Sequence, residues 1–268
     1  MCRCFELSRA AYYEWLTKPN VDKYAELKEE VKKVFDSQGK KYGYRRVHMA
    51  LLNKNTICSQ KVVRKIMKEG SMKGAKRKRK GPYSNTPKKE IEPLSNLLNR
   101  DFTAKAPNQK WVTDITYIWT NSGWVYLAVI LDLFARKVIG WSVSYHPNTD
   151  LVLEALFMAV KGRNPGRDVI VHSDQGCQYT SHRWSNTLNS LGFKISMSGK
   201  GQCWDNAPME SWNGTLKRET DVVSEKKEDL NEVKNVLFEW IETDYNTSRL
   251  HSTLGYRSPA DFEKKWAA

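Results

Sequence analysis

Three acidic residues lie where a folded chain rarely leaves a carboxylate without a compensating partner. Asp114 interrupts the apolar run of residues 111–117, and Asp174 directly follows a second such run. Glu210 falls in the first turn of a helix that Pro208 opens. A carboxylate inside a strand is costly to bury unless it is paired, hydrogen-bonded or metal-bound. One isolated Asp would simply face solvent, because strand side chains alternate. Three acids at such places favour a divalent-metal site.

A site of this kind would serve phosphoryl transfer. Hard cations such as Mg²⁺ take one or two carboxylates per ion and complete their shell with phosphate oxygens of the substrate. A shared carboxylate holds two ions roughly 4 Å apart, where one activates the attacking hydroxyl and the other stabilises the leaving oxygen. Asp114, Asp174 and Glu210 are therefore candidate catalytic residues and metal ligands.

The helix that carries Glu210 has a polar stripe. Asn206, Glu210, Asn213 and Lys217 follow one another at helical spacing and share one face. Lys217 lies two turns beyond Glu210, where its ammonium group could hold a DNA phosphate beside the metal ions. The alternative interpretation is the ordinary solvent-facing side of an amphipathic helix.

The positive charge of the chain is concentrated in its first part. The 268 residues include 44 Lys and Arg and 30 Asp and Glu, a net charge of +14. Residues 1–110 hold 27 of the basic and 11 of the acidic residues, a net charge of +16, so residues 111–268 carry −2. A basic module joined to a near-neutral one favours nucleic-acid binding. A solvated basic linker is the alternative.

Helical spacing predicts three helices in the basic part, over residues 23–37, 46–52 and 59–68, with Ser59 as the N-cap of the third. Val62, Val63, Ile66 and Met67 form the apolar face of this third helix, and Lys61, Arg64, Lys65 and Lys68 form its basic face. A basic helix after a short turn is what a helix-turn-helix DNA binder needs. The run Lys76, Arg77, Lys78, Arg79 and Lys80 precedes Gly81 and Pro82 and predicts a linker that follows the DNA backbone.

From residue 111 the pattern changes to β-structure. Residues 111–119, 123–131 and 135–144 predict three antiparallel strands. Helices and strands then alternate, with helices at 151–160, 180–191, 206–218 and 230–245 and strands at 168–173 and 193–197. This α/β layout fits a ribonuclease-H-like mixed sheet. We expect a helix-turn-helix-like domain at 1–72, a basic linker at 73–106, and a catalytic core with C-terminal helices at 107–268.

Other classes of protein are excluded. No apolar run approaches the roughly 18 residues that a membrane span needs, and the N-terminus has no apolar signal core. Five cysteines argue against a disulfide framework and for a reducing cytosol. Cys2 and Cys4 have no nearby His, so we expect no zinc site.

The spacing of the acids and the sequence around them together resemble a known family. Glu210 comes 36 positions after Asp174, which comes 60 after Asp114. The matching blocks are WVTDITY at 111–117, HSDQGCQY at 172–179, GKGQCWDNAPMES at 199–211, TLKRE at 215–219, the tail from 245 to 259, and YGYRRV at 42–47. The chain resembles the Asp-Asp-Glu transposases and retroviral integrases. Within them it is similar to the bacterial transposases encoded by the second reading frame of the insertion-sequence-three family.

The resemblance implies a ribonuclease-H-like core in which Asp114, Asp174 and Glu210 hold two Mg²⁺ ions, with Mn²⁺ as a substitute. It implies cleavage at the 3′ ends of an insertion element, followed by strand transfer, without a covalent protein–DNA intermediate. The implied partners are the terminal repeats, the target DNA, further copies of the chain, and an upstream-frame fusion segment. The implied location is the bacterial cytoplasm, on the nucleoid. Besides the basic residues named above, the predicted DNA contacts are Arg45, Arg46, Lys200, Asn213 and Lys217.

Two alternatives remain open at this stage. A nuclease of the same fold would only hydrolyse DNA, although the basic N-terminal part and Lys217 argue against it. A non-catalytic DNA-binding protein would use the basic part alone, although the three acids argue against that.

Overall fold

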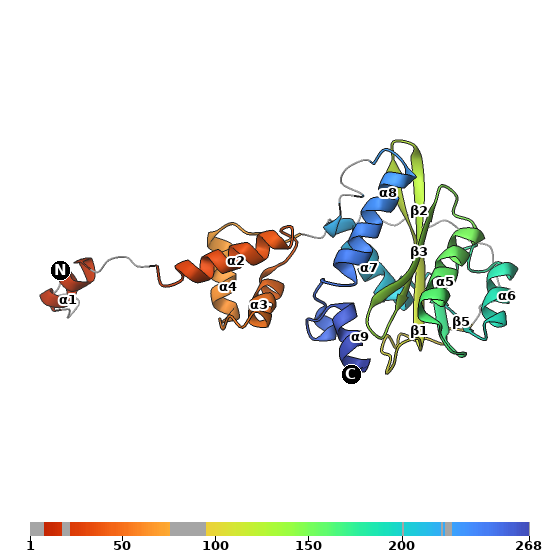
Figure 1. Ribbon diagram of the computed structural model, residues 1–268, viewed down its shortest axis with the longest axis horizontal. Coiled ribbons are helices and arrows are strands. Elements are labelled where there is room, and N and C mark those ends of the chain that lie inside the picture. The colour runs from red at the N-terminus through yellow and green to blue at the C-terminus, as the bar shows by residue number, and fades with distance from the viewer. Residues whose placement is uncertain are drawn as a thin grey trace. The chain divides into compact units, whose positions relative to one another are not determined.

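The computed structural model describes residues 8–17, 22–75, 95–199, 201–220, 222 and 227–267. The chain divides into two compact units, Met1–Gly74 and Ala75–Ala268 (Figure 1). Among the described residues, no helix combines the length and the apolar character needed to cross a membrane.

The first unit is helical. Helix α1 spans Arg9–Thr17, and α2 (Ala25–Ser37), α3 (Tyr44–Asn53) and α4 (Gln60–Glu69) pack against one another. Their shared core consists of buried residues that include Val34, Phe35, Val47, Leu51, Val63, Ile66 and Met67. The Oγ of Ser59 accepts a hydrogen bond from the Val62 amide at 3.3 Å, which confirms the predicted N-cap of α4. All three helices predicted from spacing are present.

The second unit contains a five-stranded mixed sheet in the order β3-β2-β1-β4-β5. Strands β1 (Lys110–Thr120), β2 (Gly123–Asp132) and β3 (Lys137–Ser144) are antiparallel. Strands β4 (Ile170–Ser173) and β5 (Lys194–Met197) run parallel to β1. The predicted order of three antiparallel strands followed by alternating helices and strands is confirmed.

Helices cover both faces of this sheet (Figure 1). Trp111, Ala128 and Ile130 pack under α5 (Thr149–Arg163) and α6 (His182–Ser190). Side chains of the opposite face, such as Val112, Leu127 and Val129, pack with α7 (Ala207–Glu219) and α8 (Leu230–Phe238). Neighbouring residues of β1 therefore enter different cores, because successive strand side chains point to opposite faces.

Gly140 brings α5 into direct contact with the backbone of β3. A Cβ atom on this glycine would lie 2.2 Å from the carbonyl oxygen of Ala155 and 2.9 Å from the Cβ of Ala159. The first distance involves a helix backbone atom, which no side-chain rotation can relieve. Glycine is therefore required for the close packing of α5 on the sheet.

Two parts of the second unit differ from the expectations drawn from sequence. Within residues 95–106, which the sequence assigns to the linker, Leu98 is buried in the core and Phe102 packs against it. The helix expected over 230–245 is α-helical only as far as Phe238, and the segment η3 (Glu239–Tyr245) forms a π-helix. Thr243 donates a side-chain hydrogen bond to the Glu239 carbonyl there, a contact that distorts helices.

Three short elements complete the described fold. A 3₁₀ turn, η2 (Cys203–Asn206), leads directly into α7. A second 3₁₀ turn, η4 (Ser252–Leu254), and helix α9 (Pro259–Ala267) follow the π-helix.

Candidate active site

Asp114 on β1 and Asp174, which directly follows the neighbouring parallel strand β4, lie at the same level of the sheet. Val112 of β1 pairs with His172 of β4, and each of these residues precedes one of the acids by two positions. Neighbouring strands are about 4.8 Å apart, so the two carboxylates lie close together where β4 ends. In sheets of this kind, ligands bind at the carboxyl ends of parallel strands.

Burial and the neighbouring acids together change the titration of Asp114. Burial raises the pKa of this carboxyl group, the negative charge of Asp174 raises it further, and Glu210 adds a smaller effect, so that the pKa reaches about 7. The hydrogen bond from Asn213 acts in the opposite direction. A pKa raised by a neighbouring carboxylate indicates a cluster of negative charge that a cation would stabilise.

Helix α7 is fastened along β1 by its predicted polar stripe. Asn206 Nδ2 donates to the backbone carbonyl of Thr113 at 3.0 Å, and Asn213 Nδ2 donates to Asp114 Oδ2 at 2.7 Å. The Nζ of Lys217 lies 5.2 Å from the centre of the Tyr117 ring. Glu210 occupies the same helix face, between Asn206 and Asn213. The stripe therefore faces β1, and Asn213, expected on DNA, orients a candidate catalytic carboxylate.

The three acids share one electrostatic environment without forming a closed ligand set. Within the part of the chain that the structure describes, no three His, Cys, Asp or Glu side chains are grouped closely enough to hold a metal ion. Asp174 Oδ1 accepts a hydrogen bond from the Gly176 amide at 2.8 Å. In this arrangement of the described side chains, the three acids therefore do not converge within metal-bridging reach.

The loop before α7 is tied to the core through Asp205, which sequence reasoning missed. This carboxylate is 1% exposed and accepts hydrogen bonds from Arg100 Nε at 2.7 Å, Asn96 Nδ2 at 3.1 Å and the Gly199 amide at 3.0 Å. Burial alone would raise the pKa of Asp205, but the hydrogen bonds from Arg100 and Gly199 lower it overall. The only signal in the sequence was an acid just before a helix. Its partners lie too far along the chain to be found by spacing.

His172 is a structural residue. Its Nδ1 lies 2.8 Å from Ser196 Oγ and its Nε2 lies 3.0 Å from Ser198 Oγ. Burial lowers the pKa of His172 to about 4, so the ring is neutral near pH 7. Since both ring nitrogens are occupied by serine hydroxyls, the side chain joins β4 to β5.

The tail block of the sequence forms a buried ionic cluster at the end of α7. Arg249 donates from Nε and Nη2 to the two carboxylate oxygens of Glu219, at 2.8 and 2.9 Å. His251 Nε2 lies 3.3 Å from Arg249 Nη1, and its ring contacts Tyr245. These residues fix the C-terminal segment against α7.

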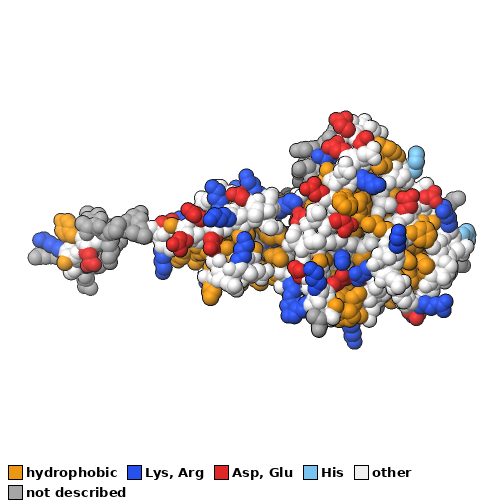
Figure 2. Space-filling view, in the orientation of Figure 1, with side chains coloured by type: hydrophobic (Ala, Val, Ile, Leu, Met, Phe, Trp, Pro, Cys, Tyr) orange, Lys and Arg blue, Asp and Glu red, His pale blue; other side chains and the backbone are white. Residues whose placement is uncertain are grey.

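The basic face predicted for α4 is exposed in the helical unit. Lys61, Arg64, Lys65 and Lys68 are all exposed, opposite the buried apolar face. Arg45 and Arg64 approach the Tyr44 ring at 5.8 and 5.6 Å, and Arg46 lies half-buried over Tyr42. Acidic side chains are interspersed with basic ones on the visible face of this unit (Figure 2). The predicted contacts Lys200 and 76–80 lie outside the described residues.

Comparison with known proteins identifies three matched regions. An HTH-like domain matches residues 23–80, and integrase core domain models match residues 104–203 and 191–259. Together they cover both structural units.

Two relatives match over most of their length. The transposase for insertion sequence element IS904 of Lactococcus lactis is 42% identical over 89% of this chain and 93% of its own length. The transposase InsF for insertion sequence IS3A of Escherichia coli is 35% identical over 99% of this chain and 93% of its own. Among solved structures, the HTLV-2 integrase catalytic core domain in complex with magnesium aligns with 59% of this chain and 98% of its own, at a TM-score of 0.47 and 17% identity.

Proposed function

Because the chain belongs to the insertion-sequence transposases related to those of IS3 and IS904, we propose that it cleaves the 3′ ends of an insertion element and joins them to target DNA. The attacking group in the second step is the freed 3′-hydroxyl, which displaces another 3′ oxygen from phosphorus. Such phosphoryl transfer depends on positioning and on the electrostatic stabilisation of developing charge.

The observation that carries this proposal is the carboxylate pair Asp114–Asp174. The pKa of Asp114 rises to about 7 because this carboxyl group is buried beside another acid. Such a pair is stable in its ionised form when a cation neutralises it, and carboxylate oxygens are the donors that Mg²⁺ prefers. The donor set therefore fits a divalent metal.

Asp114, Asp174 and Glu210 would hold the metal, with two Mg²⁺ ions expected and Mn²⁺ as a substitute. When bound, the ions would activate the attacking hydroxyl and stabilise the leaving oxygen. The hydrogen bond from Asn213 fixes the orientation of the Asp114 carboxylate. Asn206 holds the start of α7 against β1 and so keeps Glu210 beside the pair. Lys217, exposed on the same stripe, would contact a phosphate of the DNA strand.

The helical unit would bind DNA through the exposed basic face of α4 and through Arg45. Where these side chains neutralise phosphates of the DNA, counterions are released, so binding depends steeply on salt concentration. Residues 76–80 and Lys200 would add contacts to the DNA backbone. Since joining needs paired element ends, we also propose that copies of the chain associate on DNA.

Labelled element ends incubated with the chain and Mg²⁺ test the proposal directly. Asp114→Asn, Asp174→Asn and Glu210→Gln should each reduce strand joining by about a thousandfold or more, because each removes a metal-binding oxygen. Glu154→Gln, which changes an exposed acid on α5, should leave joining unchanged. Intact joining in any of the three variants would remove that acid from the site.

The same assay separates the alternatives. Cleavage without joining would indicate a hydrolytic nuclease of this fold. Binding without cleavage in the wild-type chain would indicate a DNA-binding protein that lacks catalysis.

A further inference from the structure

Three aromatic side chains remain exposed at the far end of the β1–β2 hairpin. Tyr117, Trp119 and Trp124 are 58%, 45% and 45% exposed. Trp119 lies directly opposite Trp124 in the strand register, and Tyr117 is two residues before Trp119, so the three share one face of the sheet. We call these residues the aromatic ledge. Clustered exposed aromatic residues mark a contact surface far more often than isolated ones do.

The rings of the ledge stand at steep angles to one another. The ring centres of Trp119 and Trp124 are 4.7 Å apart with an interplanar angle of 68°, and those of Tyr117 and Trp124 are 5.3 Å apart at 85°. Edge-to-face contacts of this kind hold each ring in place through its neighbour. The ledge is therefore preorganised, and each ring keeps surface for a further planar partner.

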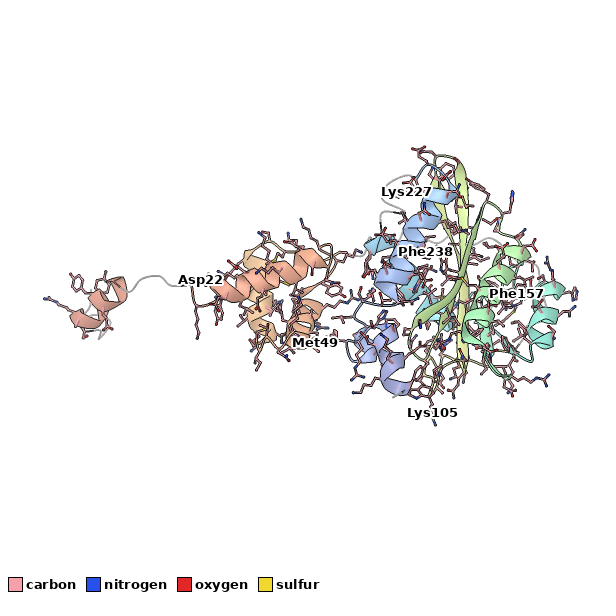
Figure 3. The ribbon with its side chains drawn as sticks, in the orientation of Figure 1. Asp22, Met49, Lys105, Phe157, Lys227 and Phe238 are labelled. Atoms are coloured by element: carbon pink, nitrogen blue, oxygen red, sulfur yellow. The ribbon has the colours of Figure 1, made fainter. Side chains whose placement is uncertain are left out.

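A cation lies beside the ledge. The Nζ of Lys217 is 5.2 Å from the centre of the Tyr117 ring, and Lys217 shares its helix face with Glu210. Aromatic rings beside a cation match the two parts of a nucleotide, since bases stack on rings and phosphates attract the cation. Lys227 forms a backbone β-bridge with Thr120 near the hairpin tip (Figure 3). Its ammonium group forms an ion pair with Glu232 at 3.8 Å.

The ledge is close to the candidate catalytic carboxylates. Tyr117 is three residues after Asp114 on β1, so the two side chains point to opposite faces of the sheet. Helix α7 reaches both of them, because Asn213 donates to Asp114 Oδ2 at 2.7 Å and Lys217, four residues later, lies 5.2 Å from the Tyr117 ring. Four helix residues span about 6 Å and a DNA strand rises roughly 3.4 Å per nucleotide, so a strand held along α7 would pass from the ledge to the carboxylates within about three nucleotides.

We propose that the aromatic ledge binds unpaired bases of the DNA strand whose phosphodiester reacts at Asp114 and Asp174; this rests on the proposed function. Stacking on the ledge holds the strand end open beside the carboxylates. A second copy of the chain is the less favoured occupant. A stable protein interface buries about 800 Å² on each partner, which three half-exposed side chains and a lysine do not supply.

The test measures metal-free binding to two DNA duplexes, one blunt and one carrying a three-nucleotide single-stranded end with 2-aminopurine in it. The wild-type chain should bind the frayed duplex more tightly and quench its fluorescence. Trp119→Ala and Trp124→Ala should each weaken this binding roughly tenfold and abolish the quenching, with little change for the blunt duplex. Trp124→Phe should retain most of the effect, because it keeps a ring.

Phe157→Ala is the matched control, since Phe157 is 52% exposed on α5 and has no ring contact with the ledge among the described residues (Figure 3). It should leave both duplexes unaffected. Thermal unfolding establishes that each variant is folded. If the alanine variants do not fold, the comparison of Trp124→Phe, which keeps a ring, with Trp124→Leu, which does not, tests the same point.

Equal loss on blunt and frayed duplexes, or unchanged quenching in both tryptophan variants, would overturn the proposal. Loss of self-association in the absence of DNA, with quenching intact, would assign the ledge to a second copy and also overturn it. Absence of metal-dependent joining with quenching intact would instead refute the proposed function alone, because the binding measurement contains no metal.

Discussion

In the helical unit the cationic side chains of α4 stand in solvent, whereas in the sheet-containing unit several arginines lie against carboxylates inside the fold. Lys65, for example, is 69% exposed, and its Nζ lies 3.8 Å from Glu69 Oε1, which is a loose ion pair. Arg249, in contrast, is 5% exposed and makes two hydrogen bonds to Glu219. Arg163 similarly bridges Asp132 and Glu263.

The difference follows from what each set of charges can do. Exposed charges contribute little to stability and are screened by salt, but they remain available to a polyanion. Buried charges lose their hydration and must be matched by a partner, so they fix geometry at a cost. The Asp114–Asp174 pair belongs to neither class, since it is half-buried and consists of two like charges.

Breaking a buried pair should have the largest effect on stability. Glu219→Ala leaves the Arg249 guanidinium buried without its carboxylate, so the free energy of unfolding should fall by about 3–5 kcal/mol. Denaturant titration followed by tryptophan fluorescence reports on this unit, because nine of the ten tryptophans lie beyond residue 110. Arg183→Ala breaks an exposed pair with Asp150 and should cost no more than about 0.5 kcal/mol. Equal losses in the two variants would erase the contrast.

Neutralising the exposed face of α4 should affect DNA binding and not stability. The combined variant Lys61→Gln, Arg64→Gln, Lys65→Gln and Lys68→Gln should bind DNA about thirtyfold more weakly, with a salt dependence flatter by up to about 0.9 per lost phosphate contact. Its thermal unfolding should change little. The double variant Lys264→Gln, Lys265→Gln on the exposed side of α9 serves as the control. An unchanged salt slope in the α4 variant would mean that this face does not contact phosphates.

Removing one charge of the like-charged pair should stabilise the metal-free protein. The pKa of Asp114 is about 7 in the folded state against 3.8 for the free side chain, so the folded state keeps a proton that the unfolded state releases. The free energy of unfolding should therefore fall as pH rises from about 4 to about 7. Asp114→Asn should remove this fall and be more stable by about 1–2 kcal/mol at pH 8, a partial value because the side chain is partly exposed.

The measurement is thermal unfolding across this pH range, with and without Mg²⁺. Added Mg²⁺ should stabilise the wild-type chain increasingly between pH 5 and 7 and have little effect on Asp114→Asn. Asn213→Ala is an informative companion, because it removes the hydrogen bond to Asp114 without changing charge. A wild-type stability independent of pH in this window would show that neither burial nor Asp174 raises the pKa of Asp114.

Local patterns in the sequence reveal the features that neighbouring residues determine. Apolar spacing located the helices and the strands, and an acid inside an apolar strand indicated Asp114 as a candidate, because a charge there contradicts the surrounding pattern. Asp205 could not be found in this way, since its partner Arg100 is 105 positions away. The role of His172 likewise depends on serines that follow another helix. The π-helix at 239–245 has an apolar periodicity so close to that of an α-helix that a sequence pattern cannot distinguish the two.

The contact between Gly140 and α5 has a consequence for how mutations inactivate copies of a mobile element. A base substitution at either of the first two positions of a glycine codon removes the glycine, and every amino acid that replaces it adds a Cβ that collides with the Ala155 carbonyl. A copy altered there keeps Asp114, Asp174 and Glu210 in its reading frame. It would nevertheless encode a displaced helix and a disturbed sheet. The presence of these three acids in a genomic copy is therefore a weaker indication of a functional element than their presence together with this glycine.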